Sequence, residues 1–247
     1  MVLIWNMLLQ QEWRCGEVGQ EDKKGKKFNS AHPYPIICEG RDGMAFIIHC
    51  LNALIRNQRI PDNRFEAIDF GGNEDIRETL KILPLLAGYS SMKSILVVRD
   101  AEQSATQAVV SLQESFRNAF DVEVPSDGSF VMNADGIRVG FYLFPGWKDG
   151  HFQDGTLEDL CDNILRDVKG EAGASYLQVS ADKYLAHVLE QKGSFRRRHK
   201  NRLHTILSGT DRFVGLKIGE AAKVGAFDFE AEEMKELNER ICEMMQP

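Results

Sequence analysis

Acidic residues follow two apolar segments of this sequence, at the positions where strands of a parallel sheet would end. Glu39 closes the apolar segment 34–38, and Asp100 and Glu102 follow the segment 94–98, the most continuous apolar run. The carboxyl ends of neighbouring parallel strands meet at one edge of a sheet, where open α/β sheets bind their ligands. If the backbone stays extended beyond residue 98, the side chains of Asp100 and Glu102 also point to one side.

Three converging carboxylates repel one another and raise one another's pKa. A hard divalent cation removes this repulsion, and carboxylate oxygens are the ligands that Mg²⁺ prefers. We therefore expect Glu39, Asp100 and Glu102 to form a site for Mg²⁺ or Mn²⁺. The alternative is that these acids lie in solvated loops at the ends of strands.

The segments around these acids alternate between strand and helix patterns. Strands are expected at 34–38, 65–70 and 94–98, with helices over 42–57, over 76–83 and after Ser104. Asp135-Gly136, between the apolar segments 130–132 and 137–144, indicates a β-hairpin. This alternation predicts an α/β fold, with a mainly parallel sheet that is flanked by helices and carries one antiparallel hairpin.

Local signals mark where the predicted helices begin and end. Ser104 with Gln107, and Thr156 with Asp159, have the spacing of capping boxes at helix starts. Pro84 is expected to end the helix that precedes the third strand.

Three segments are expected along the chain. Residues 34–174 are predicted to form the α/β core, and residues 175–247 a helical C-terminal extension packed on it, ending in an amphipathic helix over 230–245. Residues 1–33 form either an N-terminal extension or an edge hairpin, and the sequence leaves both open.

Composition limits the classes of partner. The 247 residues carry a formal net charge of -7, so the whole surface cannot attract nucleic acid, and such a partner needs a local basic patch. Five scattered cysteines, with no Cys-x-x-Cys pair, indicate buried thiols in a reducing cytoplasm. We expect no membrane association, because no apolar run approaches the length of a span. The apolar start lacks a basic leader, so a signal peptide is not expected either.

A local basic patch is present at residues 192–204, which carry six positive charges and no acid. Such a segment can neutralise several phosphates of DNA or RNA, and Phe195 can stack on a base. The alternative is a solvated surface that balances the acidic residues elsewhere. The residues expected to contact nucleic acid are Arg196, Arg197, Arg198, Lys200 and Arg202.

Several short motifs, taken in their order, resemble the TOPRIM domain. They are the strand that ends in Glu39-Gly40, the Gly71-Gly72 turn after the second strand, and the acidic pair at 100 and 102. Residues 155–160 resemble a second acidic motif of overcoming-lysogenization-defect nucleases and of uncharacterised TOPRIM-like relatives. Residues 200–205 resemble the C-terminal element of those relatives. The resemblance covers residues 34–230 and implies a TOPRIM-like fold.

The resemblance also implies roles for single residues. Glu39 matches the invariant glutamate, a metal ligand or general base, and Lys200 matches a lysine that stabilises negative charge on the phosphoryl group. Further metal ligands are implied at Asp42, Asp100, Glu102, Glu158 and Asp162. Two positions depart from the pattern: Glu102 stands where aspartate is usual, and Gly43 stands where relatives often carry an acid.

We therefore expect Mg²⁺-dependent phosphoryl transfer on nucleic acid, as in a nuclease that hydrolyses phosphodiesters. The two departures favour an alternative, a non-catalytic TOPRIM-like module that binds nucleic acid or a partner. A third alternative is action on a small phosphorylated molecule. The sequence does not define the oligomeric state.

Overall fold

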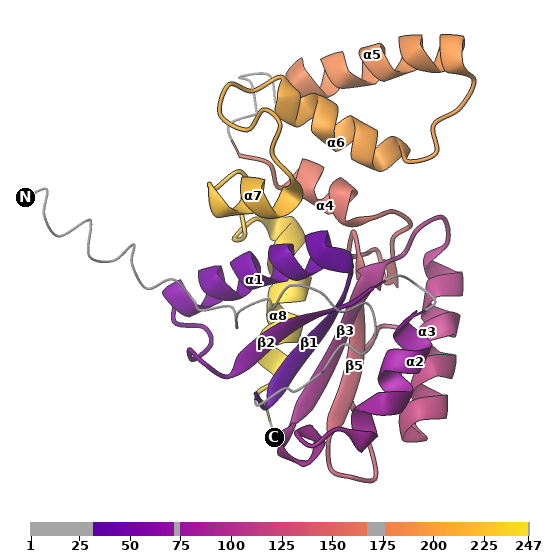
Figure 1. The fold of residues 1–247 in the computed structure, drawn as a ribbon, viewed down its shortest axis with the longest axis vertical. Helices are drawn as coiled ribbons and strands as arrows, with labels where there is room; N and C mark the ends of the chain where they lie inside the picture. Colours follow the sequence, from indigo (N-terminus) through magenta and orange to yellow (C-terminus); the bar gives the residue numbers. More distant parts are fainter. Residues whose placement is uncertain (1–31, 72–74, 167–175, 247) are drawn as a thin grey trace, which may run out of the picture.

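The computed structural model describes residues 32–71, 75–166 and 176–246. Within these ranges the chain forms a five-stranded sheet with the strand order β2-β1-β3-β5-β4 (Figure 1). β1 to β3 and β5 are parallel, whereas β4 pairs antiparallel with β5, which confirms the prediction of a mainly parallel sheet. The strands are β1 Tyr34–Glu39, β2 Phe65–Gly71, β3 Ser94–Asp100, β4 Val131–Met132 and β5 Arg138–Phe144.

β3 lies at the centre of the sheet, as its continuous apolar sequence predicts. Its residues from Ser94 to Arg99 are all buried, because neighbouring strands and helices cover both of its faces. The strand continues two residues beyond the predicted end at 98, and Asp100 still pairs in register with Phe144 of β5. Asp100 therefore lies at the carboxyl edge of the sheet.

Helices cover both faces of the sheet (Figure 1). α1 (Gly40–Arg56) lies on one face together with α8 (Lys235–Glu243), and α2 (Asp75–Ile82) and α3 (Ala105–Phe120) lie side by side on the other. The thiol of Cys50 in α1 donates a hydrogen bond to Asn238 Oδ1 of α8 at 3.3 Å. The buried residues of α1 recur at helical spacing, as the sequence pattern predicts.

The predicted helix starts at Ser104 and Thr156 are confirmed, but at Ser104 only half of the predicted capping box forms, because the Ser104 amide donates to Ala101 O. Ser104 is the N-cap of α3, and its hydroxyl accepts a hydrogen bond from the backbone of Gln107 at 3.3 Å. Thr156 and Asp159 form the predicted capping box of α4 (Leu157–Asn163). Pro84 lies in the 3-10 turn η1 (Leu83–Leu85) that ends α2.

Helices and loops follow α4 in the described part of the chain. α5 (Tyr176–Lys192) and α6 (Arg198–Ser208) form a hairpin over α4, and α7 (Ile218–Lys223) packs against α1 (Figure 1). The predicted closing helix over 230–245 is wrong in extent, because the 3-10 turn η3 (Glu232–Met234) precedes α8. Before that turn, the backbone amides of Glu230 and Ala231 donate hydrogen bonds to Asp228, which holds this part of the chain in a turn instead of a helix. The amphipathic pattern predicted for this segment is confirmed, since its apolar residues Met234, Leu237, Ile241 and Met244 are buried.

Two features lie outside the sequence predictions. A second small hairpin pairs β6 (Trp147–Lys148) with β7 (His151–Phe152), and a 3-10 turn, η2, spans Tyr89–Ser91. The predicted N-terminal extension or edge hairpin falls almost wholly outside the described residues. Among the helices of the described ranges, none is long and apolar enough to cross a lipid bilayer.

Candidate functional site

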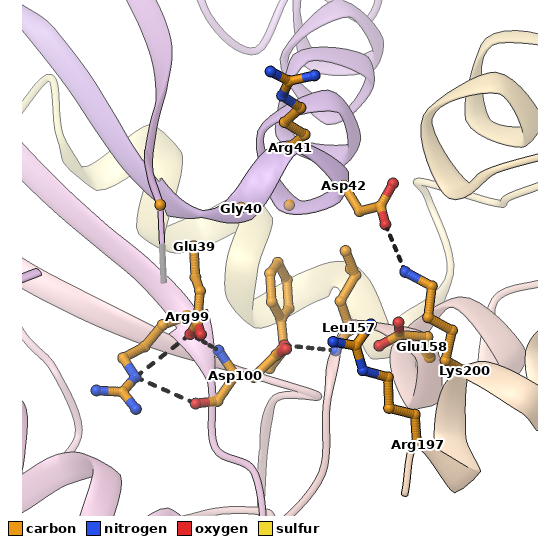
Figure 2. Close-up of a pocket in the computed structure, with 13 residues that line it drawn as sticks. Glu39, Gly40, Arg41, Asp42, Arg99, Asp100, Leu157, Glu158, Arg197 and Lys200 are labelled. Atoms are coloured by element: carbon orange, nitrogen blue, oxygen red, sulfur yellow. Dashed lines mark hydrogen bonds and ion pairs between the residues drawn. The ribbon is translucent and has the colours of Figure 1, made fainter. Parts of the chain in front are cut away.

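Glu39 is held at the junction between β1 and α1. It is the last residue of β1 and the N-cap of α1, and Gly40 directly after it has a φ of +73°, which a residue with a Cβ rarely adopts. The Glu39 carboxylate reaches the neighbouring strand β3, where Oε2 accepts a hydrogen bond from the Asp100 backbone at 3.3 Å (Figure 2). This hydrogen bond holds the Glu39 carboxylate beside the end of β3.

Arg99 forms an ion pair with Glu39. Its Nε lies 3.8 Å from Glu39 Oε2, and only 8% of the Arg99 side chain is exposed. Burial raises the pKa of Glu39, and the Arg99 guanidinium and the Asp100 amide partly offset that increase. Glu39 is therefore a carboxylate that holds a proton more readily than an exposed glutamate does.

Asp100 lies deeper at the same edge of the sheet. Its Oδ1 accepts a hydrogen bond from the backbone of Leu157, the first residue of α4, at 2.8 Å (Figure 2). Burial, and then the negative charges of Glu39, Glu158 and Glu102, raise the pKa of Asp100 to about 8, although the Leu157 amide acts in the other direction. Burial and the neighbouring anions therefore disfavour the ionised form of Asp100 at neutral pH.

These carboxylates line one cavity of about 300 Å³. The cavity opens at the carboxyl edge of the sheet, between the start of α1 and the starts of α4 and α6. Figure 2 shows Arg197 reaching toward it from the side opposite to Glu39 and Arg99. The charged side chains of its lining are Glu39, Arg41, Asp42, Arg99, Asp100, Glu158, Arg197 and Lys200.

Glu102 lines a different cavity from Glu39, although its negative charge also raises the pKa of Glu39. Its φ of +57° breaks the extended backbone that the alternation between Asp100 and Glu102 required, so the two side chains do not follow one strand. Backbone hydrogen bonds of 2.8 Å in both directions pair Glu102 with Gly155, and this pairing fixes the turn. Glu102 lines an adjacent cavity of about 360 Å³, together with Asp100, Glu158 and residues 195–200.

The donor set suits a hard cation, but its present arrangement is not a metal centre. Among the described residues, no group of three or more His, Cys, Asp or Glu side chains is positioned to hold a metal ion. The ligands offered by the cavity are carboxylate oxygens, and the high pKa of Asp100 shows that an added positive charge would stabilise its ionised form. A divalent cation therefore fits the chemistry of the cavity if Glu39, Asp100 and Glu158 change their side-chain conformations.

Polar contacts dock α6 over this edge of the sheet. They connect three of its residues with acids of α1 and α4: Lys200 Nζ with Asp42 Oδ2 at 3.0 Å, His199 Nδ1 with Asp159 Oδ1 at 2.7 Å, and Arg202 with Asp162. The Asp42–Lys200 pair is about one-third exposed on both sides and borders the cavity (Figure 2). These contacts place the basic segment beside the carboxylates.

Two residues predicted to bind ligands lie outside both cavities: Asp162, a predicted metal ligand, and Arg202, a predicted nucleic-acid contact. Asp162 is buried, pairs with Arg202 and accepts a hydrogen bond from Gln178 at 2.8 Å. The Arg202 guanidinium also donates to both carboxylate oxygens of Asp182, at 2.7 and 3.1 Å. Asp162 and Arg202 thus join α4, α5 and α6, whereas other residues line the two cavities.

The three consecutive arginines differ in their positions. Arg197 lines both cavities, and Arg196 and Arg198 line the one that also contains Glu102. Arg99 is a site residue that the sequence prediction missed. The signal was a lone cation inside the apolar segment of β3, directly before Asp100.

The fold and the site define an α/β protein whose parallel sheet carries a cavity lined by carboxylates and cations at its carboxyl edge. The chain belongs to the family described as "Protein of unknown function (DUF3226)", whose model matches residues 33–246. The comparison with curated proteins and the comparison with solved structures find no match.

Proposed function

We propose that this protein is a Mg²⁺- or Mn²⁺-dependent phosphodiesterase that acts on nucleic acid through a TOPRIM-like site. One observation carries the proposal: Glu39, Asp100 and Glu158 line the same cavity as Arg197 and Lys200. That cavity lies at the carboxyl edge of a parallel sheet, where open α/β sheets bind their ligands.

Acids and cations have complementary tasks in this proposal. Glu39, Asp100 and Glu158 would hold the divalent ion, which supplies positive charge to neutralise and orient a phosphate. Alternatively, Glu39 would act as the general base that takes a proton from the attacking water. Arg197 and Lys200 offset the negative charge that develops on the phosphate oxygens.

Lys200 is paired with Asp42 in the structure, and that pair has a role in the proposal. Exposed ion pairs contribute only about 0–1 kcal/mol, so a phosphate that offers a denser negative charge can replace Asp42 as the partner. Substrate binding then frees the Asp42 carboxylate for the divalent ion.

A cleavage and binding assay tests the proposal. Labelled single-stranded and duplex DNA and RNA are incubated with the protein and Mg²⁺ or Mn²⁺. We expect cleavage that EDTA stops and that Glu39→Gln abolishes, while Glu39→Gln retains nearly full affinity for the oligonucleotide. The matched control is Glu114→Gln, the same change on the exposed outer surface of α3, which should cleave like the wild type.

Variants of the basic segment separate binding from chemistry. Replacing Arg196, Arg197 and Arg198 together with alanine should weaken binding uniformly across sequences and flatten its salt dependence. Lys200→Ala should lower the rate more than the affinity, since its proposed role is in the transition state. Unchanged affinity and salt dependence in the triple variant would contradict a polymeric substrate and favour a small phosphorylated one.

A non-catalytic module is the second candidate function. It is supported by the arrangement of the acids, since within the described ranges they form no group of three that could hold a metal ion. Oligonucleotide binding without any cleavage in either metal would favour this candidate over the phosphodiesterase.

A cytoplasmic location is part of the proposal. The buried cysteines Cys38, Cys50 and Cys161 are free thiols, which are usual in reducing compartments.

A further inference from the structure

A third cavity lies between α5 and α6, on the other side of the basic segment. Its volume is about 570 Å³, and Leu185 and Val188 of α5 form part of its apolar wall. Phe195 lines this cavity and also the one that contains Glu102 and the three arginines. The Phe195 side chain therefore lies between the third cavity and the proposed phosphate-binding surface.

Flat rings and hydrogen-bonding groups are combined in the lining of this cavity. The rings belong to Tyr184, Phe195 and His204, and the polar groups are the side chains of Asn201, Thr205 and Ser208. Tyr184 is 58% exposed, although an aromatic side chain of this size gains free energy by burial. Apolar stacking faces beside amide and hydroxyl groups are the features that bind an unpaired nucleobase.

We propose that this cavity binds a nucleobase of single-stranded nucleic acid while the backbone of the same strand lies along residues 195–200. The inference rests on the proposed function and specifies its substrate class. The base stacks on Phe195 or Tyr184, and Asn201 contacts its edge. Base stacking on aromatic side chains tolerates different sequences, because every base has a π-face.

Charge around the cavity favours this occupant over an apolar helix of a partner protein. Lys192 Nζ lies 5.3 Å from the centre of the Phe195 ring, and Arg196, Arg197 and Arg198 follow directly in the sequence. A ligand that enters past these cations must carry negative charge next to its flat apolar part. A nucleotide of a polymer has both. The bases of a duplex are stacked and paired, so only an unpaired strand can place one here.

Binding of two oligonucleotides without divalent metal tests the inference. The probes are a 12-nucleotide oligothymidylate and a strand of the same length and charge that has abasic residues throughout. We expect the wild type to bind the base-bearing strand more tightly. Phe195→Leu and Tyr184→Leu keep apolar volume but remove the ring. The variant that lacks the stacking ring should weaken that binding by about 5- to 150-fold while affinity for the abasic strand is unchanged.

Tyr176→Leu is the matched control, because Tyr176 is another exposed tyrosine of α5, at 66%, and lies outside this cavity. It should bind both strands like the wild type, and thermal melts confirm that all variants are folded. Equal affinity of the wild type for the two strands, or equal losses on both in the ring variants, refutes the base pocket and leaves the proposed function intact. If the wild type binds neither strand, the nucleic-acid function and the inference both fail.

Discussion

Asp100→Asn should stabilise the metal-free protein at neutral pH, although it removes a residue of the proposed site. The pKa of Asp100 is raised from 3.8 to about 8 in the folded protein, so at pH 7 the folded chain holds a proton that the unfolded chain has lost. At pH 7 the unfolded Asp100 is about three pH units above its pKa, and protonating it on folding costs about 1.4 kcal/mol for each unit. The cost of this protonation to the free energy of unfolding is therefore at most about 4 kcal/mol. Asparagine has no proton to restore, and its amide oxygen can still accept the hydrogen bond from Leu157.

The direction of the pH dependence follows from the raised pKa. An acid whose pKa is raised by folding favours the folded state below its unfolded pKa, near pH 4, and this advantage is lost as the pH rises toward 8. The wild type should therefore lose stability between pH 4 and pH 8 relative to Asp100→Asn. The difference in the free energy of unfolding should be close to zero at pH 4 and reach about 2–4 kcal/mol at pH 7.

Urea denaturation in EDTA at several pH values measures this difference, and Mg²⁺ provides a second comparison. Mg²⁺ should stabilise the wild type by mass action and have little effect on Asp100→Asn. The control is Asp121→Asn, the same change at an exposed left-handed position that asparagine tolerates. Parallel pH curves for wild type and Asp100→Asn would refute the reasoning about Asp100, and equal Mg²⁺ stabilisation would mean that the metal binds elsewhere.

Three further changes test the structure around the site. Asp162→Ala should lower the free energy of unfolding by about 1–3 kcal/mol in urea denaturation, because it leaves the Arg202 guanidinium without its buried partner. Asp182→Ala removes the exposed partner of the same guanidinium and should cost less, about 0–1 kcal/mol. Ser104→Ala removes the N-cap of α3 and should cost about 1 kcal/mol in the same assay, and an unchanged midpoint would contradict that cap. Phe46→Ala opens a cavity beneath α1 and should cost about 3–5 kcal/mol, measured by thermal melting, and a loss below about 1 kcal/mol would mean that this core position is not closely packed.

Much of the fold could be predicted from local patterns in the sequence. The apolar run of β3 is central in the sheet, because only a strand covered on both faces needs apolar residues at every position. Ser104 and Thr156 begin the helices that they were predicted to begin, since a capping side chain satisfies backbone groups a few residues away. Glu39 and Asp100 end parallel strands that are neighbours, and for this reason the sequence could place them at one edge.

Positions that depend on distant contacts could not be predicted in this way. The left-handed turn at Glu102 is fixed by backbone hydrogen bonds to Gly155, more than fifty residues later, so the regular alternation after β3 gave no sign of it. Asp162 and Arg202 have suitable residue types for a metal ligand and a phosphate contact, yet they pair with each other once α6 packs on α4.

The sequence by itself determined the alternation of strands and helices from β1 to α3, the edge at which Glu39 and Asp100 meet, and the position of the basic segment along the chain. These features depend on residues that are close in sequence or on the direction of parallel strands. Only the tertiary structure decided which charges face the cavity and which neutralise one another. Lys200 borders the cavity and Arg202 does not, although they are two residues apart on α6, because successive side chains of a helix point about 100° apart. Lys200 therefore meets Asp42 of α1, whereas Arg202 meets Asp162 of α4 and Asp182 of α5.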